Sequence, residues 1–451
     1  MIPVHRRHFL SFLAAAAGAP AADTPKRGGR VLSTRPQDYE MGLDGFLEYL
    51  TPIDRFYVRS HHYTPTLKAE TYKLEIGSLT LSLDDVKKMP KTELVSVCEC
   101  AGNGRSLYEP GMPGLQWEHG SVGNARWGGI RLADLLKRAG VPAGSKYVLF
   151  DGADVPVGKM PDFQRGIPLD KAMHPDTLLA YEMNGQTLPV SHGYPLRVVV
   201  PGWAGDSWVK WVTKVMLLDK DPDVFFMKTG YRHPGKPVTP GVAVDPAQMK
   251  PVESLRVKSV IATPVENTAV KSGANVRVAG AAWSGASPVT AVEVSLDRGR
   301  TWKPAVLGAE KHTYGWRLWH FDWKPEATGH YRVMARARTA NGDTQPFDPE
   351  WNPSGYLWNV VHRVTVNVTD DPSAFAAAAP PAAPRTMPAP AVYKDRCIGC
   401  HEEDVITQQR LTRAQWDREV TKMTNWGAEV PAGDRNDLLD YLAARFGPGK
   451  R

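Results

Sequence analysis

The feature that most constrains the fold of this chain is a low-complexity stretch at residues 370–390, DDPSAFAAAAPPAAPRTMPAP. A run dominated by alanine and proline buries too little apolar surface to form a core, and its prolines favour an extended backbone. We predict a semi-rigid linker, which at ~3.1 Å per residue reaches on the order of 60 Å. The chain of 451 residues is therefore expected to fold in separate parts, a large one before the linker and a small one over residues 391–451.

The part before the linker shows two successive sequence patterns. Between residues 70 and 230, strand-like runs such as YKLEI and KYVLF mix with one amphipathic segment, LADLLKRAG, which predicts a helix that ends at Gly140. From residue 251, short alternating segments such as ANVRVAG and VTAVEVSLD are separated by turns, which is typical of an immunoglobulin-like sandwich. We therefore predict an α+β domain over residues 23–250, irregular over 24–60, and then an all-β domain over residues 251–369.

The N-terminus has the pattern of a targeting signal. Arg6 and Arg7 precede a short apolar stretch, and Ala19-Pro20-Ala21 matches a small-residue cleavage site. The arginine pair followed by Phe-Leu is typical of a twin-arginine signal, which exports folded proteins, whereas an ordinary secretory peptide has the same general layout. We expect residues 1–22 to be removed and the mature protein to be periplasmic. No apolar run reaches the ~18 residues of a membrane span.

The net charge of the chain limits the classes of partner that it is expected to bind. The formal net charge is +7, and it falls to +5 when residues 1–22, which hold two arginines and no acid, are removed. The basic residues form no cluster on a helix or arm, so nucleic-acid binding is not expected. A small anionic substrate or an acidic partner protein is compatible with this charge.

The segment after the linker contains the pattern Cys397-Ile398-Gly399-Cys400-His401. In an exported protein C-x-x-C-H is the attachment pattern of c-type haem. A thioredoxin-type redox pair or a plain disulfide would leave the adjacent histidine and so small a module unexplained. We predict a small all-α cytochrome c module over residues 391–451, with one covalent haem held by Cys397 and Cys400 and with His401 on the iron.

The same module contains two predicted helices. Thr412 and Gln415 form a capping box at the start of the first, and Asp434 begins the second. Met423 is the only methionine after His401, although a methionine at helical spacing is more often a core residue. We predict His401/Met423 ligation of the iron, which would raise its potential and suit an electron acceptor.

The other two cysteines, Cys98 and Cys100, lie in VSVCECAGNGR. In an extended strand their Cα atoms would lie roughly 6.6 Å apart on one face. That separation is near the limit for a disulfide, so a mutual bridge is not expected. The glycines after Cys100 predict an exposed thiol at a strand end, with Arg105 five residues on. These residues fit either a soft metal ligand beside an anion site or a buried free thiol.

The sequence around these cysteines resembles a known family. CAGNGR followed by GLQWEHGSVGNARWGGIRLADLL is similar to the signature of the sulfite oxidase family of molybdenum enzymes. The likeness continues through SHGYPLRVVVPGWAGDSWVKW and into the β segment as VEVSLDRGRTW and PEWNPSGYLWNVVHRV, and it covers about residues 50–370. The arrangement resembles bacterial sulfite dehydrogenases, with a cytochrome fused behind the linker. It implies a sulfite-oxidase-type α+β molybdopterin domain followed by a β domain that commonly makes dimers.

The resemblance assigns roles to residues of this chain. Cys100 is implied to be the thiolate ligand of molybdenum, and Cys98 to be a structural strand residue. The implied molybdopterin-binding residues are His61, Asp154, His192, Arg197 and Lys210. The implied catalytic residues are the substrate-binding arginines Arg59 and Arg105, with Trp117 and Tyr231 lining the site.

Two positions depart from the family pattern. Gly104 stands where the animal enzymes usually carry a second arginine, and Ser354 stands where a further substrate-side arginine is expected. A pocket with less positive charge is compatible with weaker sulfite binding or with another sulfur species.

The expected activity is oxidation of sulfite, or a related small sulfur oxyanion, to sulfate at a molybdenum–molybdopterin cofactor. Electrons would pass through the haem to a soluble cytochrome c, and a homodimer is compatible with the resemblance. One alternative is a sulfane dehydrogenase-like component of a thiosulfate-oxidising complex that acts on protein-bound sulfur. A methionine-sulfoxide reductase would have little use for the cytochrome. A haem electron carrier without turnover is the non-enzyme alternative.

Overall fold

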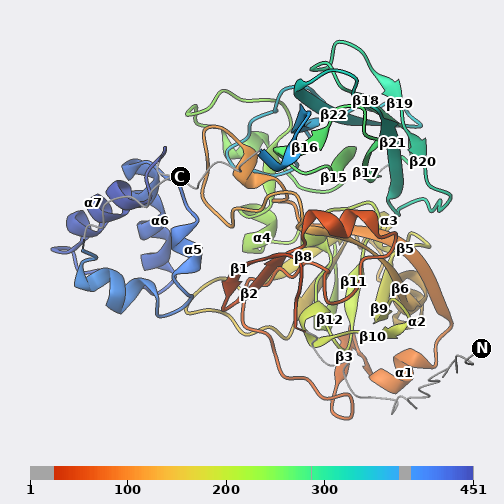
Figure 1. The fold of residues 1–451 in the computed structure, drawn as a ribbon. Helices are drawn as coiled ribbons and strands as arrows, with labels where there is room; N and C mark the ends of the chain where they lie inside the picture. The colour runs from red at the N-terminus through yellow and green to blue at the C-terminus, as the bar shows by residue number, and fades with distance from the viewer. Residues whose placement is uncertain (1–24, 286, 375–387, 450–451) are drawn as a thin grey trace, which may run out of the picture.

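The computed structural model describes residues 25–285, 287–374 and 388–449 (Figure 1). The predicted signal at residues 1–22 and the middle of the predicted linker lie outside these ranges. We call residues 25–250 the first domain, 251–369 the β domain and 391–449 the C-terminal module. Within the described ranges, no helix combines the length and apolarity that crossing a bilayer requires.

The first domain contains two five-stranded sheets. One has the order β10-β9-β6-β5, with β11 also pairing β9, and the other has the order β4-β3-β12-β7-β8. Only the β3–β12 pair of these two sheets is parallel. The strands are β3 Lys73–Ile76, β4 Leu79–Ser82, β5 Lys91–Glu99, β6 Val122–Arg131, β7 Tyr147–Gly152, β8 Gln164–Pro168, β9 Leu178–Met183, β10 Gln186–Thr187, β11 Arg197–Val199 and β12 Val212–Leu218.

Short helices pack against these sheets. Their bounds are α1 Leu83–Lys87, α2 Leu132–Ala139, α3 Leu169–Ala172 and α4 Phe225–Lys228. Helix α1 contacts β4, α2 contacts β6, α3 contacts β7 and β8, and α4 contacts β8. Helix α2 buries Leu132, Leu135 and Leu136 on one face, as expected from apolar residues at helical spacing. Its C-cap is Gly140 with φ +80°, so the predicted end of the helix is confirmed.

The prediction that residues 24–60 are irregular was wrong for residues 30–47 and correct for residues 48–60, which contain no helix or strand element. Strands β1 (Arg30–Thr34) and β2 (Gln37–Glu40) form an antiparallel hairpin, followed by the 3-10 helix η1 (Leu43–Leu47). The side chains that β2 buries include the carboxylates Asp38 and Glu40, which pair with arginines. A strand whose buried positions are polar lacks the apolar alternation on which the prediction depended.

The β domain is a two-sheet sandwich, so the predicted immunoglobulin-like architecture is confirmed. Its sheets have the orders β15-β17-β21-β20 and β16-β23-β22-β18-β19, and valines and tryptophans fill the space between them. A short ribbon of β13 (Arg232–Pro234) and β14 (Met249–Pro251) leads into it. The strands are β15 Lys258–Thr263, β16 Thr268–Lys271, β17 Val276–Trp283, β18 Val289–Ser295, β19 Lys303–Pro304, β20 Val306–Leu307, β21 Arg317–Trp323, β22 Gly329–Thr339 and β23 His362–Thr369.

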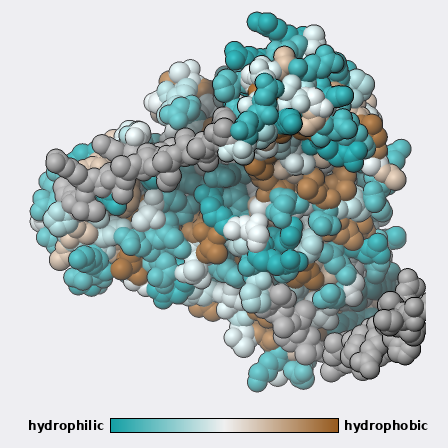
Figure 2. Space-filling view, viewed as in Figure 1, coloured by the Kyte–Doolittle hydropathy of each residue, from teal (hydrophilic) through white to brown (hydrophobic). Residues whose placement is uncertain are grey.

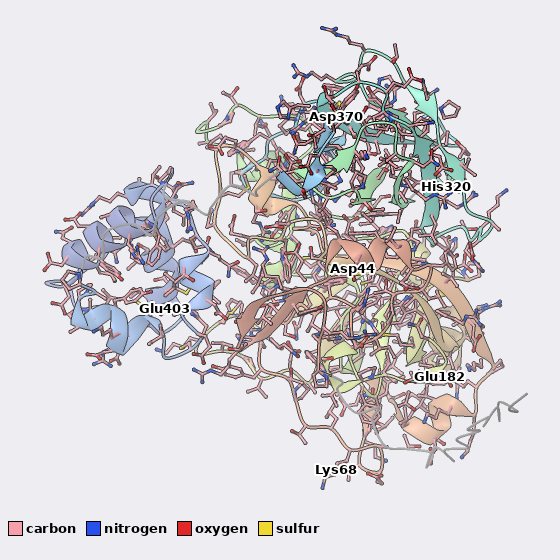
Figure 3. All side chains as sticks on the ribbon, viewed as in Figure 1. Asp44, Lys68, Glu182, His320, Asp370 and Glu403 are labelled. Atoms are coloured by element: carbon pink, nitrogen blue, oxygen red, sulfur yellow. The ribbon has the colours of Figure 1, made fainter. Side chains whose placement is uncertain are left out.

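The first domain and the β domain share a core. The helix η1 packs against β15 and β17, and Phe46 stacks on Trp283 with ring centroids 5.8 Å apart. Asp44 of η1 marks this boundary in Figure 3, and His320 lies in the β domain beyond it. On the side of the molecule seen in Figure 2, the surface is mainly hydrophilic, with apolar residues in small groups.

The C-terminal module is helical, as predicted. Its helices are α5 Asp404–Thr407, α6 Arg413–Asn425 and α7 Arg435–Arg445, preceded by a π-helical turn at Tyr393–Cys397. The capping box of Thr412 and Gln415 is present at the start of α6. The module lies against the first domain next to β1 and α4 (Figure 1).

Candidate functional site

Cys100 lies one residue beyond β5, at the start of a tight turn. The turn is closed by hydrogen bonds from Asn103 N–H to the Cys100 carbonyl and from Arg105 N–H to the Gly102 carbonyl, both 2.9 Å. The prediction of an exposed thiol was wrong, because Cys100 is only 8% exposed. A segment of the β domain covers the turn, since Leu357 N–H donates to the Ala101 carbonyl.

Two adjoining cavities meet at Cys100. The larger, of about 500 Å³, is in the size range of small-molecule sites and the smaller has about 60 Å³. Cys100, Arg59, His61 and Tyr231 line both. All the site residues named from the sequence line one cavity or the other: the larger adds Arg105, Trp117, Cys397, Cys400, His401 and Met423, and the smaller adds Asp154, His192, Arg197 and Lys210.

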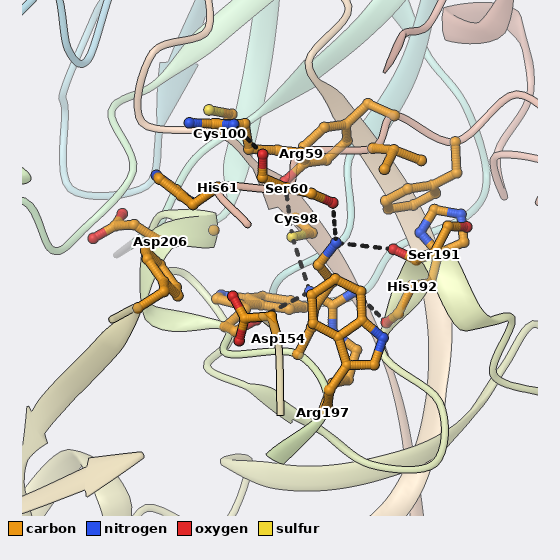
Figure 4. Close-up of a pocket in the computed structure, with 18 of the residues that line it drawn as sticks. Arg59, Ser60, His61, Cys98, Cys100, Asp154, Ser191, His192, Arg197 and Asp206 are labelled. Atoms are coloured by element: carbon orange, nitrogen blue, oxygen red, sulfur yellow. Dashed lines mark hydrogen bonds between the residues drawn. The ribbon is translucent and has the colours of Figure 1, made fainter. Parts of the chain in front are cut away.

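The smaller cavity concentrates buried positive charge (Figure 4). Lys210 Nζ donates to Ser60 Oγ and to the Ser191 carbonyl, both at 3.0 Å. Arg197 donates from Nη1 to the His192 carbonyl at 3.1 Å. In Figure 4 Cys100 lies on one side of the cavity, and Asp154 and Arg197 lie on the other.

A bound anion would balance the positive charge of these buried groups. Burial, and next the charge of Arg197, lower the pKa of Lys210 to about 7. Burial raises the pKa of Asp154, an acid that lines the same cavity, to about 7, so at pH 7 it is about half ionised and does not balance Arg197 and Lys210 together. Among the described residues, Arg197 Nε has no hydrogen-bond partner although it is buried. Buried donors of this kind fit a group with phosphate charge, so these residues fit the molybdopterin cofactor.

Two hydrogen-bonded pairs lie between the cavities. Arg59 Nη1 is 3.2 and 3.3 Å from the two carboxylate oxygens of Asp38. Burial raises the pKa of Asp38 to about 6, while the charge of Arg59 opposes that shift. The Tyr231 hydroxyl lies 2.7 Å from His61 Nε2. Burial, and next the charge of Arg59, hold the pKa of His61 well below its usual value, so its ring is neutral at pH 7.

Arg105 is the second arginine of the larger cavity. It is 9% exposed, its Nη1 donates to the Leu115 carbonyl at 3.1 Å, and its guanidinium lies 5.2 Å from the centre of the Tyr356 ring. Within the described residues, its Nε is buried without a hydrogen-bond partner. The guanidinium therefore keeps a donor for an anion in the cavity.

The structure gives a reason for the glycine at position 104. Gly104 has φ +90°, and a Cβ there would lie 2.6 Å from three atoms of the Trp358 side chain. An arginine cannot occupy this position while Trp358 stays in place. At the other departure, Ser354 lines the larger cavity and its hydroxyl donates to the Arg232 carbonyl at 2.7 Å.

The comparisons with known proteins concern the two domains that build this site. Residues 61–226 match the family described as oxidoreductase molybdopterin binding domain, and residues 249–369 match the Mo-co oxidoreductase dimerisation domain. The chain is 37% identical to the mitochondrial sulfite oxidase of Rattus norvegicus over 379 residues, which cover 78% of this chain and 68% of the rat enzyme. This chain belongs to the sulfite oxidase family. It is thus a molybdopterin-dependent oxidoreductase, which disfavours a haem carrier without turnover.

Other members of the sulfite oxidase family show the same range of similarity. The mitochondrial sulfite oxidase of Drosophila melanogaster is 35% identical over 377 residues, which cover 78% of this chain and 65% of that enzyme. The chain thus spans about two thirds of the length of these relatives. A solved structure, the sulfane dehydrogenase SoxCD from Paracoccus pantotrophus, superposes with a TM-score of 0.65 at 27% identity and covers 75% of this chain and 88% of that one.

Neither family match extends to the C-terminal module, because both end by residue 369. Its four predicted haem residues nevertheless face one space, since Cys397, Cys400, His401 and Met423 line the larger cavity together with apolar residues. Both cysteines are free thiols, and burial raises the pKa of Cys397 to about 11. Two thiols, an imidazole and a thioether around an apolar space fit a covalently bound haem c.

Sequence reasoning missed three residues of the site. Asp38 neutralises Arg59, Tyr356 packs against Arg105, and Cys98, predicted to be structural, also lines the smaller cavity, with its Sγ 3.2 Å from the Tyr57 hydroxyl. Asp38 belongs to no sequence motif that could have identified it. Tyr356 lies in a segment that resembles the family, but the segment does not show which of its side chains points toward the cavity. Only the position of Cys98, two residues before Cys100 on a strand, placed it on the same face.

Proposed function

We propose that this protein is a sulfite dehydrogenase of the bacterial periplasm. It oxidises sulfite to sulfate at a molybdenum–molybdopterin cofactor and passes the electrons through a covalent haem c on its own C-terminal module to a soluble cytochrome c. The observation that supports this most is the larger cavity, because Cys100 and both substrate arginines line it together with Cys397, Cys400, His401 and Met423.

The site residues of the first domain divide the tasks of this reaction among them. When bound, the molybdenum cofactor supplies an oxygen atom and takes two electrons, so that sulfite and water become sulfate, two protons and two electrons. Cys100 would hold the metal, while the buried cations of the smaller cavity and His61 would hold the pterin and its phosphate. Burial raises the pKa of the Cys100 thiol to about 11, so metal binding must displace its proton.

The substrate anion would bind between Arg59 and Arg105, since planar guanidinium groups pair with oxyanions and stay charged at all working pH values. His61, which is neutral, fixes the Tyr231 hydroxyl at 2.7 Å and so orients it toward the cavity. Trp117 is fully buried in the wall of the cavity and would give a bound anion an apolar neighbour in place of water. The chain thus contributes binding, orientation and electrostatics.

In the C-terminal module, Cys397 and Cys400 would carry the haem, which transfers electrons singly, and His401 and Met423 would ligate its iron. The apolar side chains around these residues include Ile406, Val420, Leu438 and Leu442. An apolar shell of this kind and a methionine ligand both raise the potential of the iron, which favours electron flow toward the module.

A sulfane dehydrogenase-like activity is the second candidate. The similar solved structure is that of a sulfane dehydrogenase, and the pocket here has less positive charge than the family pattern, because residues 104 and 354 are glycine and serine. Asp38 lowers it further by pairing with Arg59. A pocket of this charge suits a substrate other than a free dianion.

The test uses the full chain matured in a periplasm that attaches haem c. Metal analysis should return molybdenum and iron in equal amounts, and anaerobic sulfite should reduce the haem, seen by its absorbance. The variant Cys100→Ser should keep the haem and lose this reduction, whereas Cys397→Ser with Cys400→Ser should lose the haem and keep molybdenum. Iron without molybdenum would refute the proposal, and a fully loaded protein that is inert to free sulfite would favour the sulfane activity.

Export is tested separately. The variant Arg6→Lys with Arg7→Lys should remain in the cytoplasm if the N-terminus is a twin-arginine signal. Unchanged periplasmic amounts would indicate another route.

A further inference from the structure

Glutamines of the C-terminal module hold a loop of the first domain. Gln408 and Gln409 follow directly after α5, and the loop is residues 111–117, which contain no helix or strand. Gln116 N–H donates to Gln408 Oε1 at 2.7 Å, and Gln409 Nε2 donates to the Gly114 carbonyl at 2.9 Å. Gln116 Nε2 also donates to Gln409 Oε1 at 3.4 Å.

The same loop positions Arg105 on its other side. The Leu115 carbonyl accepts from Arg105 Nη1, and the Trp117 carbonyl accepts from Ser106 N–H at 3.1 Å. Gly114 has φ +114°, and a Cβ at this residue would lie 2.7 Å from Arg105 Nη1, so the loop backbone is in close contact with the guanidinium. A movement of residues 114–116 would therefore move Arg105 or remove its hydrogen bond.

The module is also attached to the first domain away from this loop. The Tyr63 hydroxyl donates to the Cys400 carbonyl at 2.8 Å, and Lys159 N–H donates to the Trp426 carbonyl at 2.8 Å. The glutamine contacts are thus separate from the contacts beside the cysteine pair. Gln409 is 5% exposed, so its amide is a buried part of this contact.

We infer that docking of the C-terminal module positions Arg105, so that docking and binding of the substrate anion support each other. The inference rests on the proposed function, which places Arg105 at the anion. Gln408 and Gln409 act through the loop and are positioning residues. Since coupling between two binding equilibria is reciprocal, an anion in the cavity must strengthen docking by the same factor by which docking strengthens anion binding.

The first experiment measures sulfate binding to the full-length holoenzyme by calorimetry at low ionic strength. Sulfate has the charge and shape of the product and is not oxidised. The double variant Gln408→Ala/Gln409→Ala should bind sulfate at least about fivefold more weakly, the lower end of usual coupling factors. Its KM for sulfite should rise by a similar factor, with kcat changed less. The matched control, Tyr63→Phe, loses a docking contact outside the loop and keeps the glutamine contacts, so it should bind sulfate within about twofold of the parent.

The second experiment tests reciprocity in the unmodified protein by hydrogen exchange. Sulfate should slow exchange in residues 111–117 and also in residues 404–411 of the module, and the double variant should lose the second effect. Sulfate affinity of the double variant equal to that of the parent, or no change in residues 404–411, would overturn the inference. If the double variant folds poorly, Gln409→Ala alone should show the same losses in smaller measure.

The variant Arg105→Met separates this inference from the proposed function. If Arg105→Met lowers sulfate affinity and the glutamine variants do not, the inference fails and the role of Arg105 stands. If Arg105→Met leaves sulfate affinity unchanged, the placement of the anion at Arg105 fails, and the inference fails with it.

Discussion

At the scale of single residues, the site depends on buried polar groups that balance one another. Arg59 faces Asp38, Lys210 faces Ser60 and Ser191, and Tyr231 faces His61, all at 2.7–3.3 Å. Groups with so few partners respond strongly to a single substitution or to one proton.

Replacing Gly104 by alanine should destabilise the protein. Gly104→Ala places a Cβ against Trp358 at φ +90°, which costs about 1–2 kcal/mol for the left-handed backbone and about 1–3 kcal/mol for the overpacking. The matched control is Gly185→Ala, which has φ +77° and nothing within 4 Å of the added Cβ. In thermal unfolding followed by tryptophan fluorescence, the midpoint should fall clearly further for Gly104→Ala. Equal shifts would show that the contact with Trp358 does not limit the residue at position 104.

Protonation of Asp38 should make anion binding depend on pH. The pKa of Asp38 is raised by burial to about 6, so above pH 6 its carboxylate neutralises Arg59, and below pH 6 its protonation frees that charge. Sulfate, which keeps both charges in this range, should therefore bind more tightly as the pH falls from 7 to 5, by at most about tenfold per pH unit for one proton.

The control for this prediction is Asp38→Asn. Lys210 also faces Asp38 and has a pKa of about 7, so it is mostly protonated at pH 6 and below in both proteins. Calorimetry at several pH values should give a flatter profile for the variant. An equally steep profile in both proteins would assign the pH dependence to Lys210 or another group.

At the scale of elements, the end of β5 is fastened to the β domain by a buried ion pair. Glu99, the last residue of β5, accepts from Lys258 Nζ of β15 at 2.6 Å and from Trp283 Nε1 of β17 at 2.7 Å. Asn103 of the following turn donates to the same carboxylate at 2.8 Å. Cys100 lies between these anchored residues, so the β domain fixes the turn that carries the candidate metal ligand.

Removing one partner of this pair should be costly. Lys258→Met leaves Glu99 buried without its counter-charge, which should destabilise the protein by about 3–5 kcal/mol. The exposed pair of Arg277 and Asp322, each 62% exposed, is the matched control, and Arg277→Met should cost no more than about 1 kcal/mol. Urea unfolding measures both, and similar small shifts would show that the buried pair does not hold the two domains together.

At the scale of the whole molecule, the C-terminal module completes the larger cavity. The cavity is lined on one side by the first domain and on the other by α5, α6 and α7, so the two predicted cofactor sites share one cavity. Their proximity suits transfer of electrons within one chain.

The oligomeric state of the protein can be predicted from its β domain. The match of residues 249–369 to a dimerisation domain favours a homodimer. Light scattering during gel filtration should give about twice the mass of the mature chain, which is 49.7 kDa before removal of any signal. A mass of one chain at micromolar concentration would contradict this, and it would leave the catalytic site unaffected, since that site lies within one chain.

The sequence by itself determined the order of the parts and most of the site. Alternating apolar residues in 251–369, the helix ending at Gly140 and the capping box at Thr412 are local patterns, and local patterns depend on backbone geometry that neighbours in sequence share. The family-like motifs named residues that the structure brings to two adjoining cavities. These include positions as far apart in sequence as Arg59 and Tyr231.

Only the tertiary structure decided how these residues are balanced. Asp38 on Arg59, Trp358 against Gly104 and the glutamines of the module on the loop before Trp117 are contacts between segments that no short-range pattern links. The prediction that the Cys100 thiol is exposed was wrong for the same reason, because the segment that covers its turn includes the distant residue 357. Burial and charge at a site are sums over everything that packs around it, so they exist only once distant segments have met.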